Sequence, residues 1–425
     1  MGVIKILLER ELIMIKKFFI ENFCSIKDRL EISFEASKIE DDTFYNNTFS
    51  YKDLEMLKVV SFYGMNASGK STIVRGFAAL RELVIPQPML PYHPFEFDEE
   101  TKNAPISIGI EFTPKNTDDA TLYKYSVVYN RNAILEEKFE KMTSQKPSLL
   151  YERGADGIRL GQTVQNDILL QAIKGSIIPG RTFLSMFNQF RVTDFYDAFM
   201  FFAFGLVNIS PEVTRFDDII PNRIMTDENF KKFTIKLLQA ADFNISDIYV
   251  EKTSMPTMSP VPNMVGIKAE RDALFFVHKS GETGGAIEFV KESLGTKKIT
   301  VLASHLYPVL SKPSVFIVDE LESSLHPELT ELIIKCFLDE TINPYNSQLL
   351  FTSHETVLLN LNLLRRDEIN FVYKDEKTCS TFIRSLKEFH ARKGENIEKA
   401  YLAGRYLTSP EVKEQLLAGA ANEQN

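Results

Sequence analysis

The chain has 425 residues, of which 44% are hydrophobic and 25% are charged. This composition is typical of a globular protein with a sizeable core, and it excludes a mainly disordered, collagen-like or disulfide-stapled chain. The net charge is −9, so any contact with nucleic acid requires a local basic patch.

The three cysteines, Cys24, Cys336 and Cys379, form no C-x-x-C pair and are too few for a disulfide framework. They indicate a reduced, cytoplasmic compartment. No uninterrupted apolar run reaches about 18 residues, so we expect neither a spanning helix nor a membrane partner. A strand-like run opens at Met14, and the first thirteen residues therefore read as an extension whose presence depends on whether Met1 or Met14 is the start.

The first part of the chain is predicted to be rich in strands. A hairpin is expected over 18–34, an apolar strand over 57–63 and a helix over 70–84. A proline-rich connector at 86–94 ends that helix. Alternating segments between 106 and 160 then predict four antiparallel strands.

The second part is predicted to be mainly helical up to residue 241, with the apolar stretch 195–207 as a buried helix. A loop with three prolines is expected at 253–263. Downstream we expect, in chain order, a helix at 295–310, a strand at 315–318, a helix at 325–339 and strands at 348–352, 368–373 and 379–385.

The segment 64–71, GMNASGKS, matches G-x-x-x-x-G-K-[ST] in full, between an apolar strand and a helical pattern. Glycines let successive N–H groups point at phosphate oxygens, Lys70 adds charge at the β/γ-phosphates, and the Ser71 hydroxyl ligates Mg²⁺. A ligand-free turn is disfavoured, because a chance match is expected roughly once or twice in a hundred such chains. The predicted ATP-binding residues here are Gly64, Asn66, Ser68, Gly69, Lys70, Ser71 and Thr72.

Two carboxylates, Asp319 and Glu320, follow the apolar strand 315–318. Asp319 is expected to hold Mg²⁺ indirectly, by contacting the groups that bind the ion, and Glu320 to polarise the attacking water as general base. His354 follows the later strand 348–352. Parallel topology can present Lys70, Glu320 and His354 at one sheet edge. If each motif is considered alone, alternatives remain. Asp319 and Glu320 could form an acidic turn that faces solvent, and His354 could be an ordinary polar residue with no catalytic role.

The segment ESLGTKK at 292–298 predicts a second helix start, besides the one after the loop 64–71. Its backbone N–H groups, around Ser293 and Gly295, could bind an anion. A capped helix without a ligand is the alternative.

The order of all these motifs resembles that of an ABC-type ATPase head. The resemblance implies that Ser293 and Gly295 of one subunit cap the γ-phosphate held by the loop of another, in a head-to-tail homodimer or higher oligomer. It also implies that Glu320 is the catalytic base and His354 the γ-phosphate sensor. Gln189 is the candidate for the metal-contacting glutamine of such heads.

A closer resemblance covers residues 14–410, to AAA/ABC-like ATPases of bacterial abortive-infection and phage-defence operons, of the RloA or AbiL type and related to SMC-type heads. It is carried by IENFCSIK at 20–27, SLGT at 293–296, DELESSLHP at 319–327, LRRD at 364–367 and NIEKAYLAGRY at 396–406. Arg365 or Arg366 reaches phosphate or aspartate, or lies in a solvated turn; the sequence leaves this open. Such proteins resemble sensors that restrain a separately encoded effector, a nuclease or toxin, until infection.

We therefore expect an α/β fold, a P-loop NTPase with an ABC-ATPase head built from a mixed central sheet and an antiparallel β subdomain, plus an inserted mainly helical lobe. The expected parts are the N-terminal half of the head at 1–165, the inserted lobe at 166–264, the C-terminal half of the head at 265–410 and a flexible tail at 411–425.

The predicted function is an ATP-hydrolysing switch that senses infection and controls the effector. The alternative is a DNA-repair or recombination ATPase acting on DNA ends. That alternative requires a basic strip, for which Lys297, Lys298, Arg392 and Lys393 are the candidates.

Overall fold

The computed structural model describes residues 13–38, 46–114, 121–142, 146–209, 219–241, 244–256, 268–280, 283–323, 325–391 and 394–406. The predictions for the first twelve residues, for the tail at 411–425, for Arg392 and Lys393 and for most of the 253–263 loop lie outside these residues.

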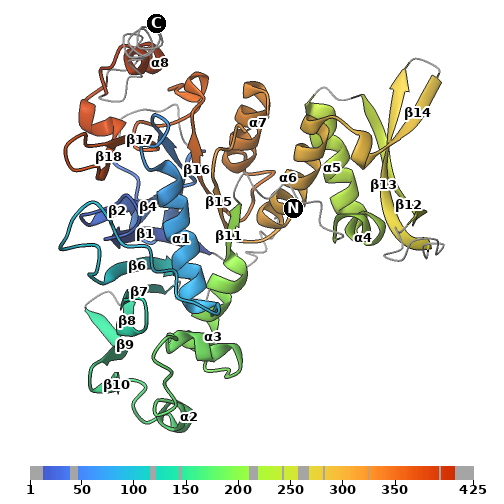
Figure 1. Cartoon of the computed structure of the whole chain (residues 1–425). Helices are drawn as coiled ribbons and strands as arrows, with labels where there is room; N and C mark the ends of the chain where they lie inside the picture. Colours follow the sequence, from blue (N-terminus) through green and yellow to red (C-terminus); the bar gives the residue numbers. More distant parts are fainter. Residues whose placement is uncertain are drawn as a thin grey trace, which may run out of the picture.

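A six-stranded, mostly parallel sheet forms the centre of the molecule (Figure 1). Its strands in spatial order are β11 (Leu206–Ile209), β15 (Val315–Val318), β16 (Gln348–Ser353), β5 (Val59–Tyr63), β17 (Ile369–Lys374) and β18 (Thr381–Ser385). All neighbours pair in parallel except β17 and β18. Strands β5, β15 and β16 are buried at every position, as expected for a sheet covered on both faces.

A seven-stranded antiparallel sheet packs beside it. Its order is β10 (Gly157–Leu160), β9 (Pro147–Gly154), β8 (Ile134–Met142), β7 (Leu122–Tyr129), β6 (Ile106–Thr113), β1 (Met14–Glu21) and β2 (Leu30–Ser33). A small hairpin of β3 (Thr48–Tyr51) and β4 (Leu54–Leu57) adjoins it. These strands and the parallel sheet confirm the predicted α/β fold with its antiparallel subdomain.

Helix α1 (Lys70–Val84) shares one hydrophobic core with both sheets. The rings of Phe18 on β1 and Phe77 on α1 stack with their centroids 3.9 Å apart. A Cβ at Gly76 would lie 3.0 Å from Cδ1 of Ile20, so the glycine allows this close approach. On the other face of the parallel sheet, α6 (Leu294–Ser311), α7 (Pro327–Leu338) and α8 (Ile397–Leu402) contribute to a second core.

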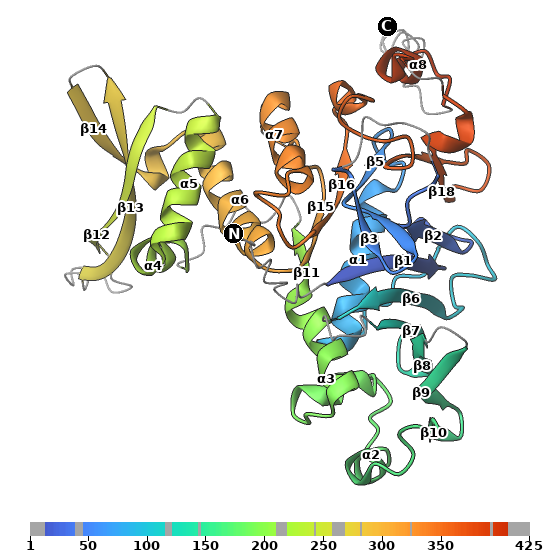
Figure 2. The same cartoon turned by 180° about the vertical axis from the view of Figure 1, so that it is seen from behind.

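A lobe of mixed structure projects beyond α6, on the side away from the antiparallel sheet (Figures 1 and 2). It contains α4 (Ile219–Thr226), α5 (Glu228–Ala240) and the sheet of β12 (Ile245–Pro256), β13 (Lys268–Ser280) and β14 (Thr283–Glu288). The described part of 166–264 contains more helix than strand, but the projecting lobe also carries this three-stranded sheet, which the expected mainly helical lobe did not include. The expected boundary at 264 falls between β12 and β13, which pair with each other along their whole length.

The stretch 195–207 also differs from the predicted single helix. Helix α3 (Thr193–Met200) continues as a π-helical turn over Phe201–Gly205, and the chain then enters β11 of the parallel sheet. The remaining helical pieces are α2 (Ile168–Ile173) and the 3₁₀ turns Leu184–Asn188, Phe289–Lys291, Thr356–Leu358 and Leu386–Phe389. Among the described residues, none of the helices combines the length and apolar character needed to cross a bilayer.

The fully buried side chain of Gln348 joins the parallel sheet to β1 and β4. Its Oε1 accepts a hydrogen bond from the backbone N–H of Ile15 at 2.7 Å. Its Nε2 donates to the carbonyl oxygens of Ile15 at 3.2 Å and Leu57 at 3.0 Å. One amide thus satisfies three buried backbone groups where three strands meet.

We expect Gln348→Ala to lower the free energy of unfolding by about 2–4 kcal/mol, because each orphaned buried polar group costs about 1–3 kcal/mol and some groups regain partners. Urea unfolding followed by circular dichroism measures the change. The matched control is Gln87→Ala at an exposed position, where a change below about 0.5 kcal/mol is expected. Equal destabilisation by both variants would contradict this role of Gln348.

Candidate functional site

The site lies at the carboxyl edge of the parallel sheet, where β5, β15 and β16 end side by side. The hydroxyl of Thr352 on β16 donates to Oδ1 of Asp319 at 2.6 Å and accepts from the backbone N–H of Glu320 at 2.8 Å. This hydroxyl ties the two carboxylate positions to the neighbouring strand. The structure thus brings together Lys70, Asp319, Glu320 and His354, which lie far apart in the sequence.

The loop 64–69 between β5 and α1 requires glycine at both ends. Gly69 caps the helix with a φ of 109°, a backbone conformation that glycine adopts readily. A Cβ there would lie 2.1 Å from Oγ1 of Thr381. At Gly64 a Cβ would lie 2.2 Å from the carbonyl oxygen of Val372. The loop is therefore pressed against β17 and β18, and a side chain at either glycine would displace it.

Lys70 reaches back across this loop. Its Nζ donates to the carbonyl oxygens of Gly64 at 2.7 Å and Met65 at 2.9 Å, and lies 3.3 Å from Nδ1 of His354. Burial lowers the pKa of Lys70 to about 8, with nearby carboxylates, Glu322 first, opposing the shift. An incoming anion would therefore stabilise the charged form of this lysine.

His354 stands between Lys70 and Glu320. Burial, and then the charge of Lys70, lower the pKa of His354 below its usual value, which favours the neutral ring near pH 7. Because Lys70 donates to Nδ1, the neutral ring carries its proton on Nε2. That nitrogen lies 3.7 Å from Oε1 of Glu320, whose backbone has a positive φ of 50°. Such left-handed conformations in non-glycine residues concentrate at functional sites.

A cluster of hydroxyl groups fixes the loop from the other side, and sequence reasoning missed it. Oγ1 of Thr381 on β18 lies 2.8 Å from Oγ of Ser25 and 2.9 Å from the carbonyl oxygen of Ser68. Oγ of Ser25 lies 3.0 Å from Oγ1 of Thr72 on α1. The three segments are remote in the sequence. The loop motif pointed to Ser68 and Thr72 and the NFCS motif contains Ser25, but nothing in the sequence pointed to Thr381.

The loop fits a triphosphate. Oγ of Ser68 is buried and has no hydrogen-bond partner among the described residues, so a ligand oxygen would satisfy it. The described residues contain no group of three or more His, Cys, Asp or Glu that could hold a metal ion by themselves. A Mg²⁺ carried by ATP needs only one or two protein ligands besides phosphate and water, and Ser71 and Asp319 offer a hydroxyl and a carboxylate.

Gln189 is not brought into this site. It is exposed and follows the turn Leu184–Asn188, which packs at the carboxyl end of α1. The hydroxyl of Thr182 just before that turn donates to the carbonyl oxygen of Leu83 at 2.8 Å. Helix α1 has 15 residues and is therefore about 22 Å long, which separates this end from Ser71. The proposal of Gln189 as a metal ligand is therefore corrected.

Ser293 is the exposed N-cap of α6, next to the partly exposed Gly295. Its Oγ accepts from the backbone N–H of Thr296 at 3.1 Å and lies 2.8 Å from that residue's hydroxyl. The flanking side chains of Val290 and Leu294 are 50% and 63% exposed. The predicted helix start is thus formed, and it lies open on the surface of this chain.

Two of the four candidates for the predicted basic strip, Lys297 and Lys298, are described and lie near the start of α6, and the strip itself stays a prediction. Nζ of Lys297 donates to the carbonyl oxygen of Val290 at 2.8 Å. Lys298 is half-buried, and burial lowers its pKa against the influence of Glu322 and Glu320.

The open question about the LRRD motif is answered by the structure. Arg365 contacts aspartate: its Nε and Nη2 each lie 2.9 Å from a carboxylate oxygen of Asp367. Nη2 also donates to the carbonyl oxygen of Ser37, whose N–H donates to Asp367 at 2.7 Å. The motif therefore fastens the segment around Ser37 to the parallel sheet.

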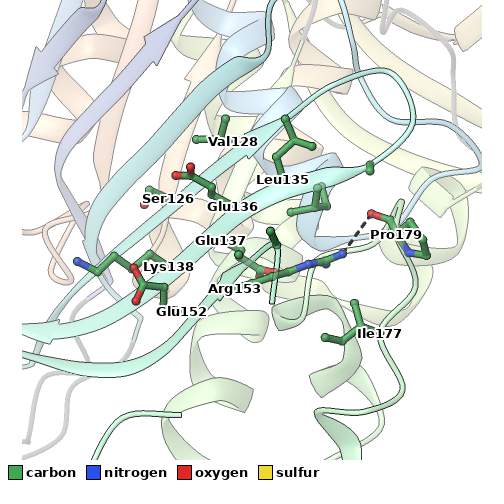
Figure 3. Close-up of a pocket in the computed structure, with 14 residues that line it drawn as sticks. Ser126, Val128, Leu135, Glu136, Glu137, Lys138, Glu152, Arg153, Ile177 and Pro179 are labelled. Atoms are coloured by element: carbon green, nitrogen blue, oxygen red, sulfur yellow. Dashed lines mark hydrogen bonds and ion pairs between the residues drawn. The ribbon is translucent and has the colours of Figure 1, made fainter. Parts of the chain in front are cut away.

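A cavity of about 720 Å³ opens on the antiparallel sheet, away from the loop (Figure 3). The buried Arg153 borders it and donates to the carbonyl oxygens of Arg181 at 2.6 Å and Pro179 at 3.4 Å. Glu137 beside it accepts from two tyrosine hydroxyls and two backbone N–H groups. The hydrogen bonds of Arg153 and Glu137 thus hold the segment 177–184 against the antiparallel sheet.

Comparison with known proteins matches residues 59–360, more than half of the chain, to a family described as "AAA domain, putative AbiEii toxin, Type IV TA system". A search of curated proteins gave no match.

Solved structures similar to the chain include two SMC heads. The SMC head domain from Thermotoga maritima is 14% identical, with a TM-score of 0.41 and coverage of 87% of this chain and 98% of the other. The Smc head from Pyrococcus furiosus, bound to the C-terminal domain of ScpA, is 11% identical, with a TM-score of 0.42 and coverage of 89% and 98%. The third is cbiO1 from Clostridium perfringens, part of the ABC transporter complex cbiONQ. It is 12% identical, with a TM-score of 0.30 and coverage of 85% and 95%.

We expect Thr381→Val to raise the dissociation constant for ATP about 5- to 10-fold, because it removes the hydroxyl that holds Ser25 and Ser68 and leaves the side-chain volume nearly unchanged. Isothermal titration calorimetry with ATP measures this. Thr378→Val, at an exposed position on the same hairpin, serves as the control and leaves the affinity unchanged. Unaltered ATP affinity in Thr381→Val would show that the contacts of this hydroxyl with Ser25 and Ser68 do not support ATP binding.

Proposed function

The chain belongs to this AAA-domain family, and on that premise we propose that it is an ATP-hydrolysing switch of an antiphage, abortive-infection system. ATP hydrolysis is supported by the meeting of Lys70, Glu320 and His354 at one sheet edge beside a complete phosphate loop. A binding module without catalysis would not need a carboxylate and a neutral histidine facing each other there.

In the proposed reaction, ATP replaces the carbonyl groups of the loop as the partner of Lys70. The N–H groups of the loop and the hydroxyl of Ser68 bind phosphate oxygens. Ser71 and Asp319 would hold Mg²⁺, which would supply neutralising charge to the phosphates. The oxygen of a water molecule forms a bond to the γ-phosphorus while the bond from this phosphorus to the oxygen of the leaving ADP breaks. Glu320 accepts a proton from that water, and the Nε2–H group of His354 donates a hydrogen bond to a γ-phosphate oxygen and keeps its proton.

The assembly that we propose is a head-to-tail homodimer. Ser293 and Gly295 lie at an exposed helix start, where N–H groups of the first turn lack intrahelical partners. Facing the loop of a second copy, this helix start would complete the phosphate shell. We call the dimer closed when the helix start of each copy faces the loop of the other, and open when the two are apart. ATP favours the closed dimer because it binds this state more tightly than the open one. The closed and open states then control a separately encoded effector, a nuclease or toxin, in the cytoplasm.

Lys70→Ala should raise the dissociation constant for ATP at least about 100-fold, because several charged hydrogen bonds to phosphate are lost. Equilibrium dialysis with labelled ATP measures the binding. Lys377→Ala, an exposed lysine on the β17–β18 hairpin, is the control. Retained tight binding in Lys70→Ala would refute the assignment of the loop.

Glu320→Gln should bind ATP normally and hydrolyse it about 10²–10⁴-fold more slowly, because the general base is lost while the shape is kept. The same variant should accumulate as an ATP-loaded dimer, detected by size-exclusion chromatography with light scattering. Hydrolysis at the wild-type rate would show that Glu320 is not the base.

The defence role is tested in cells that carry the gene together with its neighbouring reading frame. We expect the wild-type pair to lower the plating efficiency of an infecting phage, and the pair with Lys70→Ala to restore it. Protection that persists in Lys70→Ala would show that nucleotide does not control the effector.

A further inference from the structure

Glu322 lies in a short turn that leaves β15 and that is held by backbone hydrogen bonds. The N–H of Leu321 donates to the carbonyl oxygen of Thr352 at 3.1 Å, and that of Ser323 to the carbonyl oxygen of Glu320 at 2.8 Å. The N–H of Leu325 donates to the carbonyl oxygen of Glu322 itself at 2.7 Å. The backbone of Glu322 is thus fixed between the two strand ends that carry Glu320 and His354.

The side chain of Glu322 contacts the histidine segment directly. Its Oε1 accepts a hydrogen bond from the backbone N–H of His354 at 2.5 Å. Its Oε2 is buried and has no hydrogen-bond partner among the described residues. A buried carboxylate oxygen without a partner costs free energy. Glu137 shows the contrast, because both of its oxygens accept hydrogen bonds. Stability alone therefore does not account for a carboxylate at 322.

The charge of Glu322 also acts on the cations of the site. Among the nearby carboxylates, it has the largest effect in raising the pKa of Lys70 and of His354. Glu322 is also the carboxylate with the largest effect in raising the pKa of Lys298, which lies one turn beyond the start of α6. Glu322 therefore lies close enough to Lys70, His354 and Lys298 to influence all three cations.

We propose that Glu322 is a positioning residue for hydrolysis, which holds the backbone of His354 through Oε1 so that the histidine ring stays between Lys70 and Glu320. This role rests on the proposed ATPase function and adds a residue to it. The strand ends do not depend on Glu322 for their junction, because the hydroxyl of Thr352 already joins them. Loss of Glu322 should therefore affect the histidine more than the fold.

The test measures steady-state ATP hydrolysis by the purified full chain and three variants. Glu322→Ala removes the acceptor, and we expect kcat to fall about 10- to 100-fold while KM stays within about 2-fold, since the contact acts on the transition state. Glu322→Gln keeps an oxygen that can accept from His354, and its kcat should stay within about 3-fold of wild type. Glu355→Ala, beside the histidine, is the matched control and should behave as wild type.

Each other outcome overturns the inference. An unchanged kcat in Glu322→Ala, or a rise in KM alone, would show that Glu322 does not position His354. A Gln variant as slow as the Ala variant would show that the acceptor is not the relevant feature. If the Ala variant fails to melt cooperatively, Glu322→Met replaces it, because methionine keeps the length of the side chain without a carboxylate acceptor, and the same fall in kcat is expected. A wild-type chain that hydrolyses no ATP overturns the proposed function as well, whereas normal wild-type hydrolysis with an equally active Glu322→Ala overturns only this inference.

Discussion

The site depends on one hydroxyl group at the end of a buried strand. Thr352 donates to the carboxylate of Asp319 and accepts from the backbone of Glu320, and it thereby locks the end of β15 to that of β16. Parallel pairing of β16 with β5 then sets both beside the phosphate loop. Polar groups from segments far apart in the sequence meet because three strands run in the same direction and end at the same edge.

A second constraint is that the loop is held from two sheets at once. The hydroxyl of Thr381 comes from the parallel sheet, while Ser25 belongs to the turn between β1 and β2 of the antiparallel sheet. Gly69 can approach Thr381 only because it has no side chain. The antiparallel sheet therefore does two things: it packs against α1, and through Ser25 it helps to fix the loop conformation that Lys70 crosses. This preorganisation reduces the ordering that phosphate binding would otherwise require.

Local patterns in the sequence predicted most of the head. The helix at 70–84 and the apolar strand before it are confirmed, because the glycine loop and the buried apolar runs leave few alternatives. The four strands expected over 106–160 are present as β6 to β9, and β10 is a fifth that was not predicted. The sheet of the projecting lobe was missed, since prolines in 253–263 favoured a loop and obscured β12. Gln189 was placed by its position between motifs, and the packing of its turn on the far end of α1 could not be read from composition. Thr381 and Glu322 act through contacts across the fold, for which a single sequence carries no periodic signal.

In the proposed dimer, two copies share each nucleotide, the loop coming from one and the Ser293 helix start from the other. Mixing two inactive variants, Lys70→Ala and Ser293→Arg, tests this arrangement, because only a mixed dimer contains one site with both parts intact. We predict that ATP hydrolysis, absent from each variant alone, returns on mixing to about a quarter of the wild-type rate, as expected for random pairing in a two-fold assembly. Full hydrolysis by Ser293→Arg alone, or no recovery on mixing, would contradict the shared site.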